Sequence, residues 1–152
     1  SNIVGDRSTH GVILDFIRKL RRNPKELEIL GDGSQSKSYL HVKDFVDAVV
    51  LISRSFLGIK KPVEVYNVGS FDRVNVRRIA EIVGEEMGLP NLEFKFTGEV
   101  DGSRGWRGDV KTMVLSGGKL LNLGWKPALN SEGAIRLGCR ELLSSGAEAM
   151  RL

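Results

Sequence analysis

The chain has 152 residues, of which 41% are hydrophobic and 28% are charged, and its net charge is +4. These values are typical of a folded globular protein and exclude disordered, collagenous and coiled-coil chains. No apolar run reaches the roughly 20 residues that span a bilayer, and the start lacks the pattern of a signal peptide. We therefore expect no membrane partner, and the single cysteine, Cys139, predicts a reducing cytoplasm.

The first third of the chain alternates between strand and helix patterns. The opening residues have the pattern of a strand end, which suggests that the chain begins inside a structural element. Residues 10–22 have helical spacing, with Ser8 or Thr9 as the cap and Asn23-Pro24 as the end. The basic residues in the last turns of this helix complement its dipole, so we expect no nucleic-acid partner.

The segment LEILGDGSQSKSYLHVKD, residues 27–44, predicts two strands around a glycine turn. The strands are residues 27–30 and 37–42. An apolar helix over residues 45–56 follows, and Asp44 is placed to cap its start.

The remaining elements continue the alternation. Residues 63–68 and 92–96 predict strands, and between them Asn75 caps a helix over residues 76–87. A glycine-rich polar loop, a short extended piece, a short helix and a final helix capped by Ser131 come next. They occupy residues 101–109, 113–115, 118–123 and 131 onward. The order predicts an α/β fold with a small mixed sheet and flanking helices, and the few strands suggest part of a larger sheet.

Two apparent motifs do not fit the chemistry that they suggest. Gly31-x-Gly33 lacks the third glycine of a dinucleotide fingerprint and leads into a strand, so it offers a pyrophosphate no helix start. Tyr39 and Lys43 have the spacing of a catalytic pair on a helix, but here Tyr39 falls in a strand. The sequence therefore predicts no catalytic residue, and the two histidines have no partners at metal-ligand spacing.

Four separated segments resemble the extended short-chain dehydrogenase/reductases, the NAD-dependent epimerase/dehydratase family typified by UDP-glucose 4-epimerases. They are Asn2-Ile3-Val4-Gly5-Asp6-Arg7, the segment from Ile29 to Asp44, Val65-Tyr66-Asn67-Val68-Gly69, and Arg104-x-x-Arg107-Gly108-Asp109 with Leu123-Gly124-Trp125-Lys126-Pro127. The chain departs from the pattern at Val4, Asp6 and Lys37, where tyrosine, proline and arginine are usual. Their order and spacing match the C-terminal half of an extended Rossmann-type fold.

This resemblance implies a site for a nucleotide-diphosphate sugar. Lys37 and one of the two loop arginines would meet the phosphates, the start of the first helix would offer free N–H groups, and Leu30 would pack on the base or in the core. Asn2 would bind the ligand or hold the loop. The implied substrate-binding residues are Asn2, Val12, Ile13, Leu30, Lys37, Arg104 and Arg107.

The resemblance also implies missing parts. The family binds NAD through an N-terminal glycine-rich Rossmann unit and works through a helical Tyr-x-x-x-Lys, and neither is present. We expect residues 1–152 to form a single substrate-binding domain that holds no NAD alone, although a longer parent would use NAD. The alternatives are a 4,6-dehydratase fragment and a free-standing nonenzymatic domain. A lost half of the sheet predicts exposed apolar surface on residues 63–68 and the flanking helices, and hence self-association or a homodimer.

Overall fold

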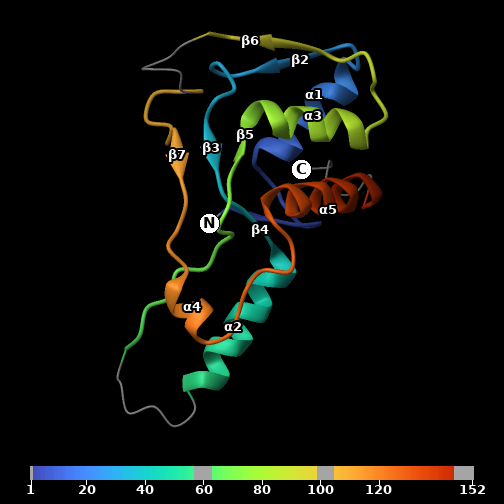
Figure 1. Ribbon diagram of the computed structural model, residues 1–152. Coiled ribbons are helices and arrows are strands. Elements are labelled where there is room, and N and C mark those ends of the chain that lie inside the picture. Colours follow the sequence, from blue (N-terminus) through green and yellow to red (C-terminus); the bar gives the residue numbers. More distant parts are fainter. Residues whose placement is uncertain (1, 57–62, 99–104, 146–152) are drawn as a thin grey trace.

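The computed structural model describes residues 2–56, 63–98 and 105–145. The α/β class is confirmed, with helices around small sheets (Figure 1). The strands are β1 (Asn2–Val4), β2 (Glu26–Ile29), β3 (Ser36–Lys37), β4 (Tyr39–His41), β5 (Val74–Asn75), β6 (Glu93–Phe96) and β7 (Thr112–Met113). The helices are α1 (Val12–Arg22), α2 (Val42–Phe56), α3 (Val76–Glu86), α4 (Gly118–Asn122) and α5 (Ser131–Ser144).

The strands pair in three short sheets. β1 runs parallel to β4, with Asn2 opposite Tyr39, and β2 runs parallel to β6. β3 lies between β5, to which it is antiparallel, and β7, to which it is parallel. Mixed pairing of this kind confirms the small mixed sheet, although it is divided more finely than the sequence suggested.

The predicted strand over residues 37–42 is in fact two strands with different partners. The strand is interrupted at Ser38. The Ser38 N–H donates to the Met113 carbonyl at 3.0 Å, and the Ser38 carbonyl accepts from the Asn2 side chain at 3.0 Å. β3 before the break and β4 after it therefore belong to different sheets. The helix that follows starts at Val42, three residues earlier than predicted.

The predicted strand over residues 63–68 is not formed. A ladder needs a neighbouring strand, and no strand of the described residues forms a ladder with this segment. Val63 and Val65 are 74% and 68% exposed, which matches the apolar surface that the sequence predicted here. α2 adds a second exposed apolar strip, formed by Val46, Val49 and Val50.

Three predicted helix caps are wrong. Gly11, not Ser8 or Thr9, precedes α1, and no side chain caps that helix. Asp44 lies inside α2 and accepts hydrogen bonds from the N–H groups of Ala128 and Leu129, so it fastens another segment. Asn130 caps α5 through the N–H of Gly133 at 2.8 Å.

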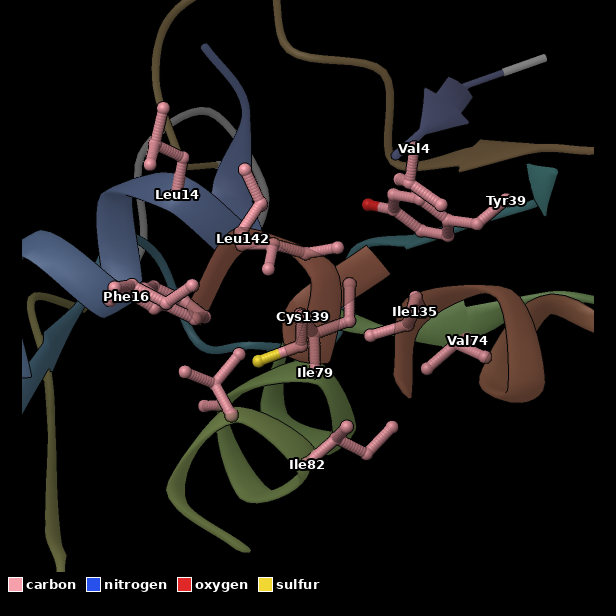
Figure 2. Packing of buried hydrophobic residues seen from close by; sticks show 14 of the residues in the cluster. Val4, Leu14, Phe16, Tyr39, Val74, Ile79, Ile82, Ile135, Cys139 and Leu142 are labelled. Atoms are coloured by element: carbon pink, nitrogen blue, oxygen red, sulfur yellow. The ribbon is translucent and has the colours of Figure 1, made fainter. Parts of the chain in front are cut away.

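The main core lies between α1, α3 and α5 (Figure 2). Ile17, Ile79 and Ile135 are at most 1% exposed, and burying such side chains stabilises the fold by roughly 1.5–3 kcal/mol each. α5 also approaches β1 closely at Gly138, where an added Cβ would lie 3.3 Å from the Cβ of Val4. A smaller core of Leu40, Ala48, Leu120 and Trp125 joins β4, α2 and α4.

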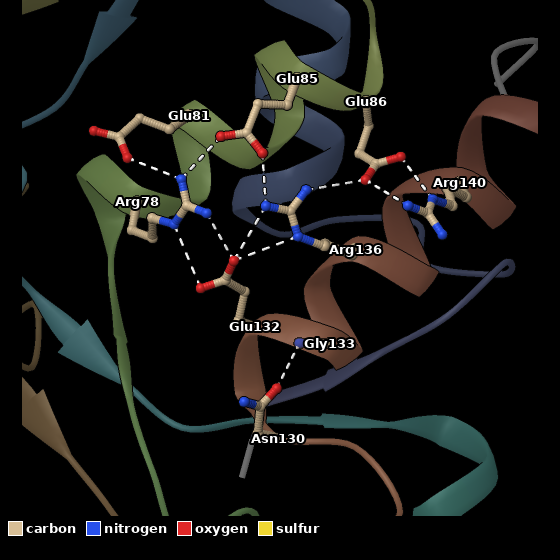
Figure 3. Close-up of polar contacts among 9 residues, drawn as sticks. All are labelled: Arg78, Glu81, Glu85, Glu86, Asn130, Glu132, Gly133, Arg136 and Arg140. Atoms are coloured by element: carbon tan, nitrogen blue, oxygen red, sulfur yellow. Dashed lines mark hydrogen bonds and ion pairs between the residues drawn. The ribbon is translucent and has the colours of Figure 1, made fainter.

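A network of arginine and glutamate side chains joins α3 to α5 on the surface (Figure 3). Arg78 contacts Glu132 at 2.7 Å and Glu85 at 2.9 Å, and Arg136 contacts Glu85 at 2.6 Å. The remaining members are Glu81, Glu86 and Arg140. Each of these carboxylates contacts at least one arginine, so this cluster is a structural contact between two helices.

Candidate functional site

A hollow of about 550 Å³ opens at the start of α1. It brings together four of the residues that the resemblance implied, Asn2, Val12, Ile13 and Lys37. β1, α1, β3 and β4 supply these and the neighbouring lining residues, and Trp106 enters from the polar loop. Segments that are far apart in the sequence thus converge on the first turn of one helix.

The first turn of α1 has an open N-terminus. Gly11 precedes it with φ 109° and ψ 165°, a conformation that only glycine adopts easily. The first helical bond runs from the Asp15 N–H to the Gly11 carbonyl at 3.0 Å, so the N–H groups of Val12, Ile13 and Leu14 precede the ladder. Such N–H groups and the positive end of the dipole favour an anion.

Lys37 lies in the same hollow, but its charge is already matched. Its Nζ is 2.7 Å from Oδ1 of Asp109, whose side chain is 3% exposed. The Gly105 N–H donates to the other carboxylate oxygen at 3.4 Å, and the ring of Trp106 lies 5.5 Å from Nζ. The ammonium is therefore held in one place between a buried carboxylate and an aromatic face.

Asn2 and Tyr39 have structural contacts in this region. The Asn2 side chain donates to the Ser38 carbonyl, so it holds the junction of β3 and β4. Tyr39 is buried, and burial, helped by the charge of Asp109, raises its pKa to about 12. A phenol with that pKa is poorly suited to proton transfer at neutral pH. Lys43 lies on α2, apart from the strand that carries Tyr39, as the sequence indicated.

The other implied residues lie outside this hollow or outside the described residues. Leu30 is 41% exposed, so it is not a core residue and its side chain is free to meet a ligand. Arg107 is exposed in the polar loop and does not line the hollow. Arg104 falls outside the described residues, so both arginines remain candidates for a second phosphate contact.

The structure adds lining residues that the sequence did not single out. Ser8, His10 and Gly11 border the hollow, and Asp109 fixes Lys37 from behind. No spacing signal marks them, because their position depends on the path of the chain between β1 and α1. The Cys139 thiol is buried in the core, and burial raises its pKa to about 12, which leaves it unreactive.

Two other kinds of feature are absent from the described residues. Across residues 2–56, 63–98 and 105–145, no group of three or more His, Cys, Asp or Glu side chains is arranged to hold a metal ion. Across the same ranges, no helix combines the length and apolar character needed to cross a bilayer.

Parallel strand pairs and flanking helices define the class as a Rossmann-like α/β fold. The family model described as "NAD dependent epimerase/dehydratase family" matches residues 1–69. The solved structure of a UDP-galactose 4-epimerase is 40% identical, with a TM-score of 0.81 over 96% of this chain and 44% of that one. Residues 1–69 thus match the model of this family, and the chain as a whole is similar to a solved UDP-galactose 4-epimerase.

Other relatives carry different nucleotide sugars in their names. A UDP-glucose 4-epimerase from Thermotoga maritima, solved with UDP-glucose, is 25% identical with a TM-score of 0.69, covering 95% of this chain and 44% of that one. A probable GDP-L-fucose synthase from Oryza sativa subsp. japonica is 30% identical over 69% of this chain and 29% of the relative. The chain thus spans less than half the length of each of these relatives.

Proposed function

We propose that the chain is the nucleotide-sugar-binding, C-terminal portion of an NAD-dependent UDP-sugar epimerase similar to UDP-glucose 4-epimerase, and that it is incomplete for catalysis alone. The observation that carries the proposal is the hollow at the open start of α1, with Lys37 beside it. We take residues 1–152 as one substrate-binding domain. A reducing cytoplasm fits the unpaired, buried Cys139.

The lining of the hollow suits a diphosphate. A diphosphate diester carries two negative charges, and it needs a cation together with neutral donors. The N–H groups of Val12 and Ile13 are such donors, and Lys37 is the cation. The exposed ring of Trp106 offers a face for a sugar, and the exposed Leu30 a surface for the base.

The glycine turn at Gly31 and Gly33 offers no helix start for the pyrophosphate of NAD. The turn at Gly31 and Gly33 continues into β3, and the helix start nearest to it, that of α3, is fully engaged. There the N–H groups of Val76, Arg77 and Arg78 donate to the Gln35 carbonyl, the Gly33 carbonyl and the Asn75 side chain. A pyrophosphate would find no free donor there, so we expect a longer parent protein to hold NAD elsewhere.

Backbone amide shifts measured by NMR during a UDP-glucose titration test the proposal. We expect weak binding, with the largest shifts at Val12, Ile13 and Lys37. Lys37→Gln should weaken binding by roughly 10- to 100-fold, because hydrogen bonds to charged groups contribute about 1.5–3 kcal/mol. Lys25→Gln, on an exposed lysine outside the hollow, is the matched control. Turnover by this chain alone would contradict the claim that it is incomplete.

A GDP sugar is the second candidate, because the rice relative is named a GDP-L-fucose synthase. The same titration with GDP-mannose separates the two possibilities. A UDP-sugar protein should bind UDP-glucose more tightly than GDP-mannose. Tighter binding of GDP-mannose would instead indicate a GDP-sugar protein.

We also propose that the chain self-associates through its exposed apolar strips. Val46, Val49 and Val50 lie three and four residues apart, so they share one face of α2. Such a face favours burial against another surface. Light scattering should show dimers or larger species that Val46→Ser with Val50→Ser dissociates. A monomer at high concentration would contradict this.

A further inference from the structure

His10 is a titratable side chain that lines the hollow and takes part in none of the contacts proposed for the ligand. It directly precedes Gly11 and lines the hollow with Lys37 and Asn2. Its side chain is exposed, and Nδ1 lies 3.3 Å from the Thr9 hydroxyl. Within the described residues no group contacts Nε2, so that nitrogen can meet a ligand.

His10 differs from the other lining side chains because it can carry a charge that no neighbouring group among the described residues pairs. β3 supplies Lys37, whose ammonium is paired with Asp109, and β4 supplies Tyr39, which stays neutral. The other elements that line the hollow contribute only side chains that do not titrate. These are Asn2, Ile3 and Val4 from β1, Val12, Ile13 and Leu14 from α1, and Leu142 from α5.

No carboxylate therefore lines the described hollow itself. A protonated His10 would be a cation without a counter-ion there, directly beside the positive end of the α1 dipole. A bound anion would supply the counter-ion that such a cation lacks.

We propose that His10 is an additional diphosphate-binding residue, which makes the affinity for a nucleotide sugar depend on pH. This inference rests on the proposed function. Imidazole changes charge between about pH 5 and 8. The protonated ring donates a charge-assisted hydrogen bond to a phosphate oxygen, so affinity rises as pH falls.

Calorimetric or NMR titrations with UDP-glucose at pH 5.5 and pH 8.0 test this. UDP-glucose suits the test because its diphosphate is a diester without a terminal phosphate, whose second ionisation near pH 6 would confuse the result. We expect binding about tenfold tighter at pH 5.5, the size of one charge-assisted hydrogen bond.

Three variants of the chain make the result specific. His10→Gln should remove the pH dependence, so that this variant binds UDP-glucose equally tightly at pH 5.5 and pH 8.0. His10→Lys, with a permanent charge, should bind at pH 8.0 as tightly as the original chain does at pH 5.5. His41→Gln changes the other histidine, which is buried against Glu141, and should retain the pH dependence.

Equal affinity at both pH values, or a pH dependence that survives in His10→Gln, would overturn the role of His10 and leave the proposed function standing. Absence of UDP-glucose binding at both pH values would overturn the proposed function itself, and this inference with it.

Discussion

The starts of α1 and α3 differ although the two helices are alike in length and pack against each other. Each has eleven residues. At α3, the Asn75 side chain and two backbone carbonyls accept from the first N–H groups. At α1, Gly11 stands where a capping side chain would, and a hollow lies in front.

The difference shows that a helix start can serve either the fold or a ligand. A capped start contributes to stability, typically by about 1 kcal/mol, and leaves nothing for an anion. An open start forgoes that contribution and keeps donors available. In this chain the glycine-rich turn, which resembles a cofactor loop in sequence, closes the start of α3.

The largest expected effect comes from removing a side chain that α1 and α3 share in the core, because both helix starts depend on that packing. Ile79 on α3 is fully buried among α1, α3 and α5. Ile79→Ala should lower the free energy of unfolding by roughly 2–5 kcal/mol, measured by urea denaturation. Val114→Ala, on a residue that is 44% exposed, is the control, and a similar loss in both would contradict the assigned core.

A pair of proline substitutions sharpens the comparison directly, because proline is tolerated at the first helical position but has no N–H. Val76→Pro removes the bond to the Gln35 carbonyl and should destabilise the chain by about 1–3 kcal/mol without affecting UDP-glucose binding. Val12→Pro should leave stability nearly unchanged and weaken UDP-glucose binding about tenfold. Denaturation and NMR titration of both variants check this, and equal effects on binding would contradict it.

Removal of one cap tests whether α3 can be made to resemble α1. Asn75→Ala frees the Arg78 N–H and should lower stability by about 1 kcal/mol, visible as a lower midpoint of thermal unfolding. Asn75→Asp keeps the acceptor and should retain stability. Neither should bind UDP-glucose at α3, because Gly33 and Gln35 still occupy the other donors.

The smallest effect concerns the network of ion pairs that joins α3 to α5. Hydrogen bonds from Arg136, Arg140 and Arg78 lower the pKa values of Glu85, Glu86 and Glu132 respectively. Because these pKa values are lower in the folded state, the stabilisation is present above the unfolded value near 4.3 and is lost as pH falls.

Glu132→Gln tests that pH dependence. It should lower stability by at most about 1 kcal/mol at pH 7, since the network is solvent-exposed, and by less at pH 3. Urea denaturation at both pH values measures the difference, and a larger loss at pH 3 would contradict the sign.

Local sequence patterns predicted most of the elements but fewer of their ends. The spacing of Ile79, Ile82 and Val83 fixes α3, and Asn75 identifies its start, because both signals lie within a few residues. Ser8, Thr9 and Asp44 are equally suitable caps by type. Ser8 is taken up in a turn with Gly5, and Asp44 reaches a distant segment. Only tertiary contacts distinguish these cases.

The candidate site was predictable in part. The resemblance placed Asn2, Val12, Ile13 and Lys37, which the fold brings together at one hollow. It did not indicate that Asp109 pairs with Lys37 across 72 positions, nor that His10 faces the same space. Segment 63–68 has strand composition, but a strand also requires a neighbour, and composition cannot supply one.

Because Lys37 is paired with Asp109, a phosphate that binds Lys37 would exchange places with the Asp109 carboxylate. An incoming phosphate does not add to a free cation but competes with a buried carboxylate 2.7 Å from Nζ. Binding as proposed would therefore replace one short-range ion pair by another, and its affinity would be less sensitive to salt than at an unpaired lysine.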